Sequence, residues 1–380
     1  MFNFAIGFVC SFLVILLIVR NTHMRSSRFL DHDLQGVQKN HAYAVPRIGG
    51  VGIAFALVAT VAAQTLVFAV PLAESAMLLL CAIPVFAGGV IEDFTKRVSP
   101  RARLICALVS ALAACLVMHS IVSRVDLPLV DQWLRVAPIG IAITMLAVAG
   151  LTNAINIIDG FNGLASVVAI FIFASIAYVA HEVNDWFIMS MALTMIGAIA
   201  AFVFWNYSVP SVFLGDGSAY LIGFMMAELL VLLIARHPNV SAWYAMIVAI
   251  YPIFETLFSI YRRRIVRGRS AGDPDALHLH TLVFRRVVGQ CLDGRNVRER
   301  TRRNSHMSVY LWAVGLVGVL PGTFFWNKPI GIAGAAVFFV ILYVWLYVSI
   351  VRFNTPRWLL FFSISSALIA PPRTEQTRQR

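Results

Sequence analysis

The chain consists of long apolar stretches separated by short polar ones. A helix needs about 20 apolar residues to cross a hydrocarbon core of roughly 30 Å, and many of the stretches have about that length. We expect about eleven membrane-spanning helices, at residues 2–20, 49–70, 75–91, 102–120, 137–153, 164–181, 186–205, 217–235, 241–261, 308–325 and 330–351. The pattern therefore predicts an all-α, polytopic membrane bundle.

The two ends of the chain need separate interpretation. The first apolar stretch has the length of a signal peptide, but no small-residue cleavage site follows it, so we interpret it as a retained membrane helix. The last apolar piece, WLLFFSISSALIA, is short for a span and is expected at the interface or as a re-entrant segment. We predict one membrane domain over 1–355, with a basic loop at 262–307. An interfacial segment and a polar cytoplasmic tail would follow over 356–380.

The composition agrees with this architecture. The chain is 60% hydrophobic and 13% charged, whereas a soluble domain carries about 25% charged residues. Four of the five cysteines lie in apolar stretches, and their spacing is not that of a metal site or a disulfide framework. The surface is therefore expected to face lipid over most of its area.

The net charge of +12 is concentrated in particular loops. The loops at 21–48, 92–101 and 262–307 are basic, whereas 71–74 has no Lys or Arg and 182–185 is acidic. The positive-inside rule then places the N-terminus outside and the basic loops and the C-terminus in the cytoplasm. Nucleic acid is a poor explanation of the charge, because no nucleic-acid-binding fold or aromatic platform accompanies it.

Five polar stretches interrupt the apolar pattern, and all of them fall on the predicted cytoplasmic side. They are VPRIGGVGI (45–53), GGVIEDFTKR (88–97), NAINIIDGFNGLA (153–165), FLGDGSAYLIG (213–223) and DPDALHLHTLVFRR (273–286). They contain four acidic residues at the hydrocarbon edge, where a carboxylate is costly unless it is paired or solvated: Glu92, Asp93, Asp159 and Asp216. Carboxylates without paired cysteines favour Mg²⁺ or Mn²⁺ over zinc. The stretches predict a phosphoryl-transfer site, and the plain alternative is four solvated helix ends.

Glycine and histidine positions point the same way. Asn156 and Asp159 share a helix face, and Gly160 behind them lets the backbone approach an anion closely. Asp216 stands at an expected helix start, a position that favours phosphate. Residues 278 and 280 are histidines that share a side of an extended loop. Since the sequence shows no partner ligand for zinc, we interpret them as hydrogen-bond donors to a phosphate or as a proton relay.

Arg285 and Arg286 follow the histidines. They are candidates for bidentate phosphate contacts. Plain positive-inside charge is an equally good account of them.

These motifs resemble one family, the polyprenyl-phosphate N-acetylhexosamine-1-phosphate transferases. PRIGG, NAINIIDGFNGLA, FLGDGSAYLIG and HLH occur in the family's order, between about Pro46 and Arg286. The pattern NAxNxxDGxxGLA is the most specific of them. The resemblance implies ten or eleven spans and transfer of a sugar-1-phosphate from a UDP-sugar to a lipid phosphate.

The sequence departs from the family pattern at three places. The usual Asp pair is Glu92–Asp93, the second acid of DGxDGLA is Asn162, and the third histidine of HxHH is Thr281. Roles are therefore not transferred to Asn162 or Thr281. The departures argue against the phospho-MurNAc-pentapeptide translocase branch and favour a branch that begins O-antigen or exopolysaccharide chains.

The resemblance also implies roles for particular residues. The expected catalytic residues are Glu92, Asp93, Asp159 and Asp216, with Asp93 and Asp216 as ligands of Mg²⁺ or Mn²⁺. The expected substrate-binding residues are Arg47, Asn153, Asn156, Gly160, His278, His280 and Arg285. Glu92 would orient or deprotonate the lipid phosphate, and the histidines would contact the diphosphate.

The expected partners are a UDP-N-acetylhexosamine, undecaprenyl phosphate and the lipid bilayer. The expected location is a bacterial inner membrane, with the site facing the cytoplasm. The sequence leaves the sugar, the glycan pathway and the oligomeric state open, a homodimer being one option. The rival from another class is a secondary transporter of an anionic solute, which also needs charges among Gly-broken helices. A membrane scaffold is the weaker third alternative.

Overall fold

The computed structural model describes residues 1–22, 45–68, 73–207, 211–268, 275, 277–288 and 297–354, with side chains omitted at 22, 68 and 297–302. Ten of its helices are long and apolar enough to cross a membrane. They are α1 (Phe2–Thr22), α2 (Gly49–Phe68), α3 (Ala73–Thr95), α4 (Pro100–Val117), α6 (Ala137–Ile158), α7 (Leu164–Glu182), α8 (Trp186–Asn206), α9 (Gly215–Arg236), α14 (Val297–Phe324) and α15 (Pro329–Val351). The predicted all-α, multi-pass membrane fold is confirmed.

One expected span differs from the prediction. The stretch 241–261 forms two short helices, α10 (Trp243–Val248) and α11 (Ile250–Tyr261), which meet at Ala249. The remaining short elements are α5 (Pro128–Leu134), α12 (Leu279–Val283) and the π-helical turns η2 (Arg262–Val266) and η3 (Phe284–Val288). Much of the predicted basic loop is thus helical, because α14 begins at Val297. The tail predicted for 356–380 lies outside the described residues.

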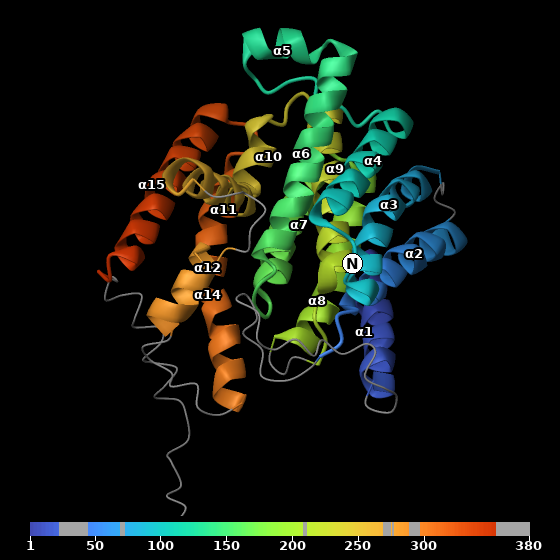
Figure 1. The fold of residues 1–380 in the computed structure, drawn as a ribbon. Coiled ribbons are helices and arrows are strands. Elements are labelled where there is room, and N and C mark those ends of the chain that lie inside the picture. Colours follow the sequence, from blue (N-terminus) through green and yellow to red (C-terminus); the bar gives the residue numbers. More distant parts are fainter. Residues whose placement is uncertain are drawn as a thin grey trace, which may run out of the picture.

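Helix α9 is the axis of the bundle. Nearly all of its side chains are buried, and α2, α3, α4, α6, α7 and α8 all pack against it. Helices α1 and α15 are at least as apolar but much less buried, so the packing of its neighbours, not its hydropathy, sets α9 apart. Figure 1 shows α9 enclosed by its neighbours, with α15 on one flank and α1 and α2 on the other.

Helices α3 and α4 are joined through a proline. Pro84 lies inside α3, where its ring disturbs the regular helical hydrogen bonding. The next backbone N–H, that of Val85, donates to the Ser110 hydroxyl of α4 at 3.0 Å. The Val85 N–H that follows the proline therefore links α3 to α4.

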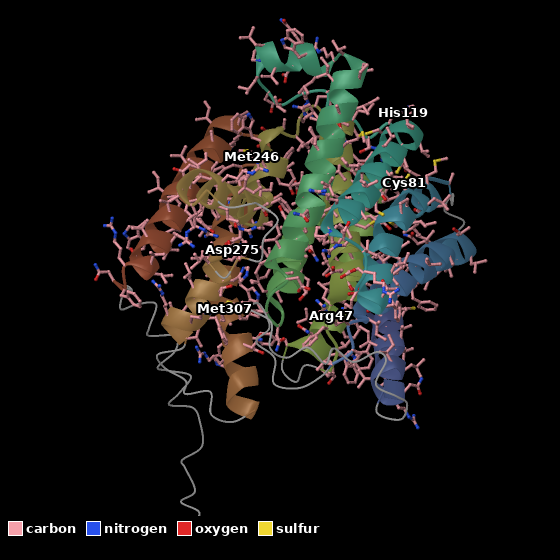
Figure 2. All side chains as sticks on the ribbon, in the orientation of Figure 1. Arg47, Cys81, His119, Met246, Asp275 and Met307 are labelled. Carbon is pink, nitrogen blue, oxygen red and sulfur yellow. The ribbon has the colours of Figure 1, made fainter. Side chains whose placement is uncertain are left out.

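The polar helix ends sort to opposite ends of the bundle. At one end, the Phe213 N–H donates to the Pro46 carbonyl at 2.8 Å, and the Gly49 N–H donates to the Phe213 carbonyl at 3.1 Å. At the other end, the Asp126 carboxylate accepts from Ser241. Figure 2 shows Arg47 and Met307 towards the lower end and His119 towards the upper one. Described residues from all five polar stretches therefore lie at the end that carries Arg47.

Candidate functional site

A cavity of about 390 Å³ lies at the shared polar end, where the end of α6, the start of α9 and the segment before α12 meet. Its lining is largely polar and charged. The lining residues are Arg47, Arg103, Asn156, Ile157, Asp159, Gly160, Phe161, Asn162, Asn206, Phe213, Leu214, Gly215, Asp216, Arg263, His278, His280 and Thr281. Residues far apart in the sequence therefore form one polar chamber.

Asp216 is positioned by the start of α9. Gly215 has a φ of +78°, a left-handed conformation that favours glycine. A Cβ there would lie 2.5 Å from the Arg47 carbonyl oxygen and 2.7 Å from Asp93 Oδ2. Both the backbone angle and the lack of space therefore require glycine at this position.

Asp93 caps α9 from a different helix. Its Oδ1 accepts the Asp216 N–H at 2.8 Å, and its Oδ2 accepts the Gly217 N–H at 2.9 Å. The first N–H groups of a helix lack intrahelical partners, and a carboxylate also suits the positive end of the helix dipole. The expected anion site at this helix start is thus taken by a side chain of the protein itself.

The Asp216 carboxylate reaches into the cavity and contacts two other helices. Its Oδ2 is paired with the guanidinium of Arg103 on α4, and its Oδ1 accepts from Asn156 Nδ2 of α6 at 3.3 Å. The Arg103 guanidinium lies 5.7 Å from the ring centre of Tyr220. The Tyr220 hydroxyl in turn donates to Asn153 Oδ1 at 3.3 Å.

Asp159 directly follows α6 and lines the same cavity. Burial raises the pKa of its carboxyl group to about 7, although the nearby guanidinium of Arg47 lowers it. Behind it, Gly163 has a φ of +72°, and its N–H donates to Asn206 Oδ1 at 2.8 Å. The turn after α6 is thereby fixed to the end of α8.

We predict that Asp159→Asn makes the purified protein more heat-stable at pH 8 in the presence of EDTA. A carboxyl group whose pKa is near 7 in the folded protein and about 3.9 in the unfolded chain favours folding only while it is protonated. That contribution is fully present below about pH 3.9 and is lost progressively as the pH rises to about 7. Melting curves at pH 6 and pH 8 should show a higher melting temperature for the variant than for the wild type, and the difference should be smaller at pH 6. A variant that is no more stable than the wild type at pH 8 would contradict this.

The two histidines form a stacked pair beside the acids. Their ring centres are 5.0 Å apart at an interplanar angle of 8°, and both rings are buried. A Cβ on Gly160 would come within 3.3 Å of His280 Nε2. Burial lowers the pKa of His280 to about 3, and His278 lowers it too. His280 is therefore a neutral imidazole near pH 7.

A buried carboxylate of α11 orients His278. Glu255 Oε1 lies 2.9 Å from His278 Nδ1 and accepts the Leu279 N–H at 3.0 Å. Its Oε2 accepts from the Tyr343 hydroxyl of α15 at 2.7 Å. Potential ligand atoms of Glu255, His278 and His280 lie within 4.8 Å of one another. Because the Glu255 oxygens already accept three hydrogen bonds, we interpret the group as an orienting network.

A second acid supports the same loop. Although burial raises the pKa of Asp275, the charges of His278 and Arg262 hold it below its usual value. Arg262 is paired with Asp275 and donates to the Leu277 carbonyl at 2.6 Å. Arg263 Nε lies 3.3 Å from the same carboxylate, and Arg263 also lines the cavity.

The structure brings together seven of the residues predicted from the sequence. Those that line the cavity are Arg47, Asn156, Asp159, Gly160, Asp216, His278 and His280. Four others are not among the lining residues. Asp93 caps α9, Asn153 accepts from Tyr220, Glu92 Oε2 accepts the Val98 N–H at 2.7 Å, and Arg285 is exposed.

Sequence reasoning missed Arg103, Arg263 and Glu255. The two arginines stand among other basic residues that the positive-inside rule explains equally well. Glu255 did carry a signal, because a lone carboxylate inside the apolar stretch 241–261 is costly without a partner. Asn162 and Thr281, whose roles the sequence left open, both line the cavity.

The donor set fits a hard divalent cation. Mg²⁺ commonly takes one or two carboxylates and completes its coordination with water and phosphate oxygens, and both Asp159 and Asp216 line the cavity. The cost of a desolvated charge at Asp159, visible in its raised pKa, would fall beside a cation. Asp93 stays a predicted ligand, but both of its oxygens already accept N–H groups of α9.

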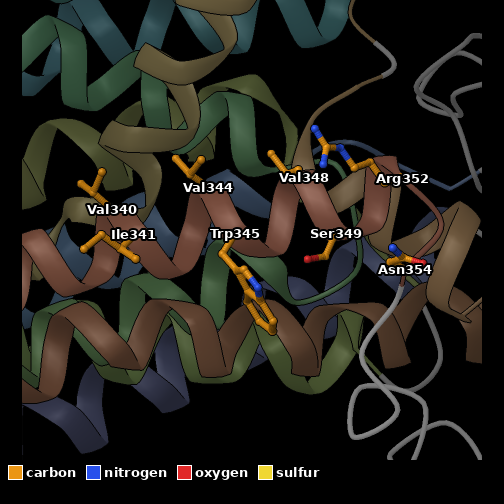
Figure 3. Close-up of a pocket in the computed structure, with 8 residues that line it drawn as sticks. All are labelled: Val340, Ile341, Val344, Trp345, Val348, Ser349, Arg352 and Asn354. Atoms are coloured by element: carbon orange, nitrogen blue, oxygen red, sulfur yellow. The ribbon is translucent and has the colours of Figure 1, made fainter.

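A larger hollow of about 660 Å³ runs along α15 (Figure 3). Its lining is mainly apolar, with Arg352 and Asn354 at one end. None of the predicted site residues lines it. An apolar face on a membrane helix is ordinary lipid-facing surface, so the polar cavity is the candidate site.

The fold and the cavity define a polytopic membrane protein with a charged site at one end of its bundle. Its sequence matches the model of glycosyl transferase family 4 over residues 75–234. This match and the relatives described next support the resemblance drawn from the motifs.

Three relatives illustrate the match. The chain is 25% identical over 289 residues to a probable undecaprenyl-phosphate N-acetylglucosaminyl 1-phosphate transferase of Bacillus subtilis, covering 74% of this chain and 77% of that protein. It is 28% identical over 272 residues to an undecaprenyl-phosphate alpha-N-acetylglucosaminyl 1-phosphate transferase of Thermotoga maritima, covering 72% and 78%. A phospho-N-acetylmuramoyl-pentapeptide-transferase of Streptococcus mutans is 26% identical over 183 residues, covering 46% and 50%.

Proposed function

We propose that the protein transfers an N-acetylhexosamine-1-phosphate from a UDP-sugar to a polyprenyl phosphate and releases UMP. The observation that carries the proposal is the cavity in which Asp159 and Asp216 face Arg47, Arg103 and Arg263. Such a mixture of acids and guanidinium groups suits a divalent cation and a diphosphate together. The relatives from Bacillus subtilis and Thermotoga maritima carry names of the same reaction class.

The reaction is a phosphoryl transfer. An oxygen of the lipid phosphate attacks the phosphorus atom that carries the sugar. The bond from that phosphorus to the oxygen of UMP breaks, and the electron pair leaves with UMP. The products are a polyprenyl diphosphosugar and UMP, and no oxidant or reductant takes part.

The protein's task in this reaction is to position anions and neutralise their charge. Asp216 and Asp159 would hold the metal ion, which supplies charge neutralisation at the phosphates when it is bound. Arg47 and Arg263 face the cavity and would bind phosphate oxygens. Glu255 fixes the ring of His278 through its Nδ1, so that the histidine pair presents a constant surface to the donor.

The comparisons favour the N-acetylglucosaminyl branch over the alternative translocase branch. The match to its members covers most of the chain, whereas the match to the pentapeptide-transferase covers less than half. Transfer to undecaprenyl phosphate at the inner membrane, beginning an O-antigen or exopolysaccharide chain, is the form of the reaction that we propose. The transporter alternative is disfavoured, because the charged cavity lies at helix ends rather than midway along the bundle.

We predict that the purified full-length protein releases UMP from UDP-N-acetylglucosamine only when undecaprenyl phosphate and Mg²⁺ are both present. Excess EDTA should abolish the release, and added Mn²⁺ or Mg²⁺ should restore it, because two phosphate anions must approach each other. Chromatography of the nucleotide and of the lipid extract measures both products.

Two controls make this test specific. Protein without the lipid acceptor should release no UMP, and a panel of other UDP-sugars should show which N-acetylhexosamine is the donor. UMP release that needs no lipid, or full activity in EDTA, would refute the proposed reaction or its metal requirement.

A further inference from the structure

Arg103 is a basic residue of the cavity that the structure pairs directly with Asp216. It lies in the first turns of α4, a helix whose start is capped by Ser99 Oγ accepting the Ala102 N–H at 3.2 Å. Both side chains of the pair are only 15% exposed. The ion pair therefore lies largely out of water, where charge interactions are stronger than at a surface.

In the structure, Arg103 is paired with the same Asp216 carboxylate that the proposed function assigns to the metal ion. Asp216 Oδ2 is paired with Arg103, and Oδ1 accepts from Asn156. A divalent cation bound to this carboxylate would lie next to the guanidinium, and two neighbouring positive groups repel each other. Repulsion therefore favours competition between the metal ion and Arg103 for Asp216.

We propose that Arg103 is an exchangeable counter-ion: it pairs with Asp216 until a divalent cation takes its place and then binds the phosphates of the donor. This inference rests on the proposed function. It gives Arg103 two roles, because the residue would limit the affinity for the metal ion and would bind the UDP-sugar. The exchange keeps every charge in the cavity compensated, because the cation arrives together with an anionic diphosphate.

The surroundings of Arg103 support the exchange. Its Nε is buried and makes no hydrogen bond within the described part of the chain, so the guanidinium has donor capacity that Asp216 does not use. A guanidinium presents parallel N–H groups that match a phosphate group. The residue lines the cavity beside Asp216, so its guanidinium is already at the place where the phosphates of the donor would bind.

The test measures metal binding without the reaction. Mn²⁺ binding to the full-length purified protein, followed by electron paramagnetic resonance with no donor present, should be about tenfold tighter in Arg103→Gln than in the wild type. Arg103→Lys keeps the charge and should stay within about twofold of the wild type. Arg101→Gln changes an exposed arginine of the same helix start and is the matched control, with unchanged Mn²⁺ binding.

Binding of the UDP-sugar gives a second measurement of the exchange. Arg103→Gln should raise the KM for the UDP-sugar at saturating Mg²⁺ by about tenfold and lower kcat less, because a phosphate contact is lost while the metal ligand stays. Asp216→Asn, which removes the shared carboxylate, should abolish specific Mn²⁺ binding.

These outcomes separate the two proposals. If Asp216→Asn abolishes Mn²⁺ binding and Arg103→Gln leaves it unchanged or weaker, the counter-ion role is overturned and the metal site stands. If Mn²⁺ binding is the same in wild type and Asp216→Asn, the proposed metal site itself fails. Should Arg103→Gln fold poorly, a wild-type affinity in a well-folded Arg103→Ala would overturn the counter-ion role equally.

Discussion

Asp216→Asn is expected to lower sugar-1-phosphate transfer by about 10²–10³-fold, the size of effect seen when one preorganised electrostatic group is removed from an active site. The substitution removes the charge that would hold the metal ion and leaves the Arg103 guanidinium without its carboxylate. The helix itself should persist, because Asp93 caps the backbone N–H groups of residues 216 and 217 whatever side chain follows.

The measurement is the transfer of labelled sugar-phosphate into the lipid extract of membranes that carry equal amounts of each variant. Asp216→Glu is the matched control, since it keeps the charge and moves it by one methylene group, and it should retain part of the activity. Asp159→Asn should abolish transfer while the protein still inserts. Undiminished transfer in Asp216→Asn would remove this residue from the mechanism.

Glu255→Leu is expected to cause the largest loss of stability. It would leave His278, the Leu279 N–H and the Tyr343 hydroxyl without their acceptor inside the bundle. Each buried polar group left unpaired costs about 1–3 kcal/mol, so the variant should melt at a clearly lower temperature and lose transfer activity.

Two further variants make this test specific. Tyr343→Phe removes one hydrogen bond to Glu255 and should cost about 1 kcal/mol. Glu182→Gln changes an exposed acid at the end of α7 and should leave the melting temperature unchanged. A Glu255→Leu protein as stable as the wild type would show that the network does not hold α11, α12 and α15 together.

The sequence predicted the helices well because the signal was local. A membrane span must satisfy its backbone hydrogen bonds within itself, so length and hydropathy locate it without knowledge of neighbours. The stretch 241–261 was the exception, because a break at Ala249 divides an apolar run that looks continuous. The start of α14 was also misplaced, because residues 297–307 are polar and carry no hydropathy signal.

The polar motifs predicted which residue types gather, but not what each one contacts. Asp93 and Asp216 looked like equivalent carboxylates in the sequence. In the structure one caps α9 through the backbone and the other faces the cavity. The sequence suggested Arg285 as a phosphate contact and did not single out Arg263, yet of these two only Arg263 lines the cavity.

By itself, the sequence determined that this protein is a helical membrane bundle with acids, amides and histidines at one set of helix ends. Those properties follow from transfer free energies and from side-chain chemistry, which belong to each residue wherever it lies. The tertiary structure decided the pairings: Asp93 with the start of α9, Arg103 with Asp216, and Glu255 with His278. Such pairings depend on how packed helices are rotated against one another, and that rotation is set by contacts between distant segments.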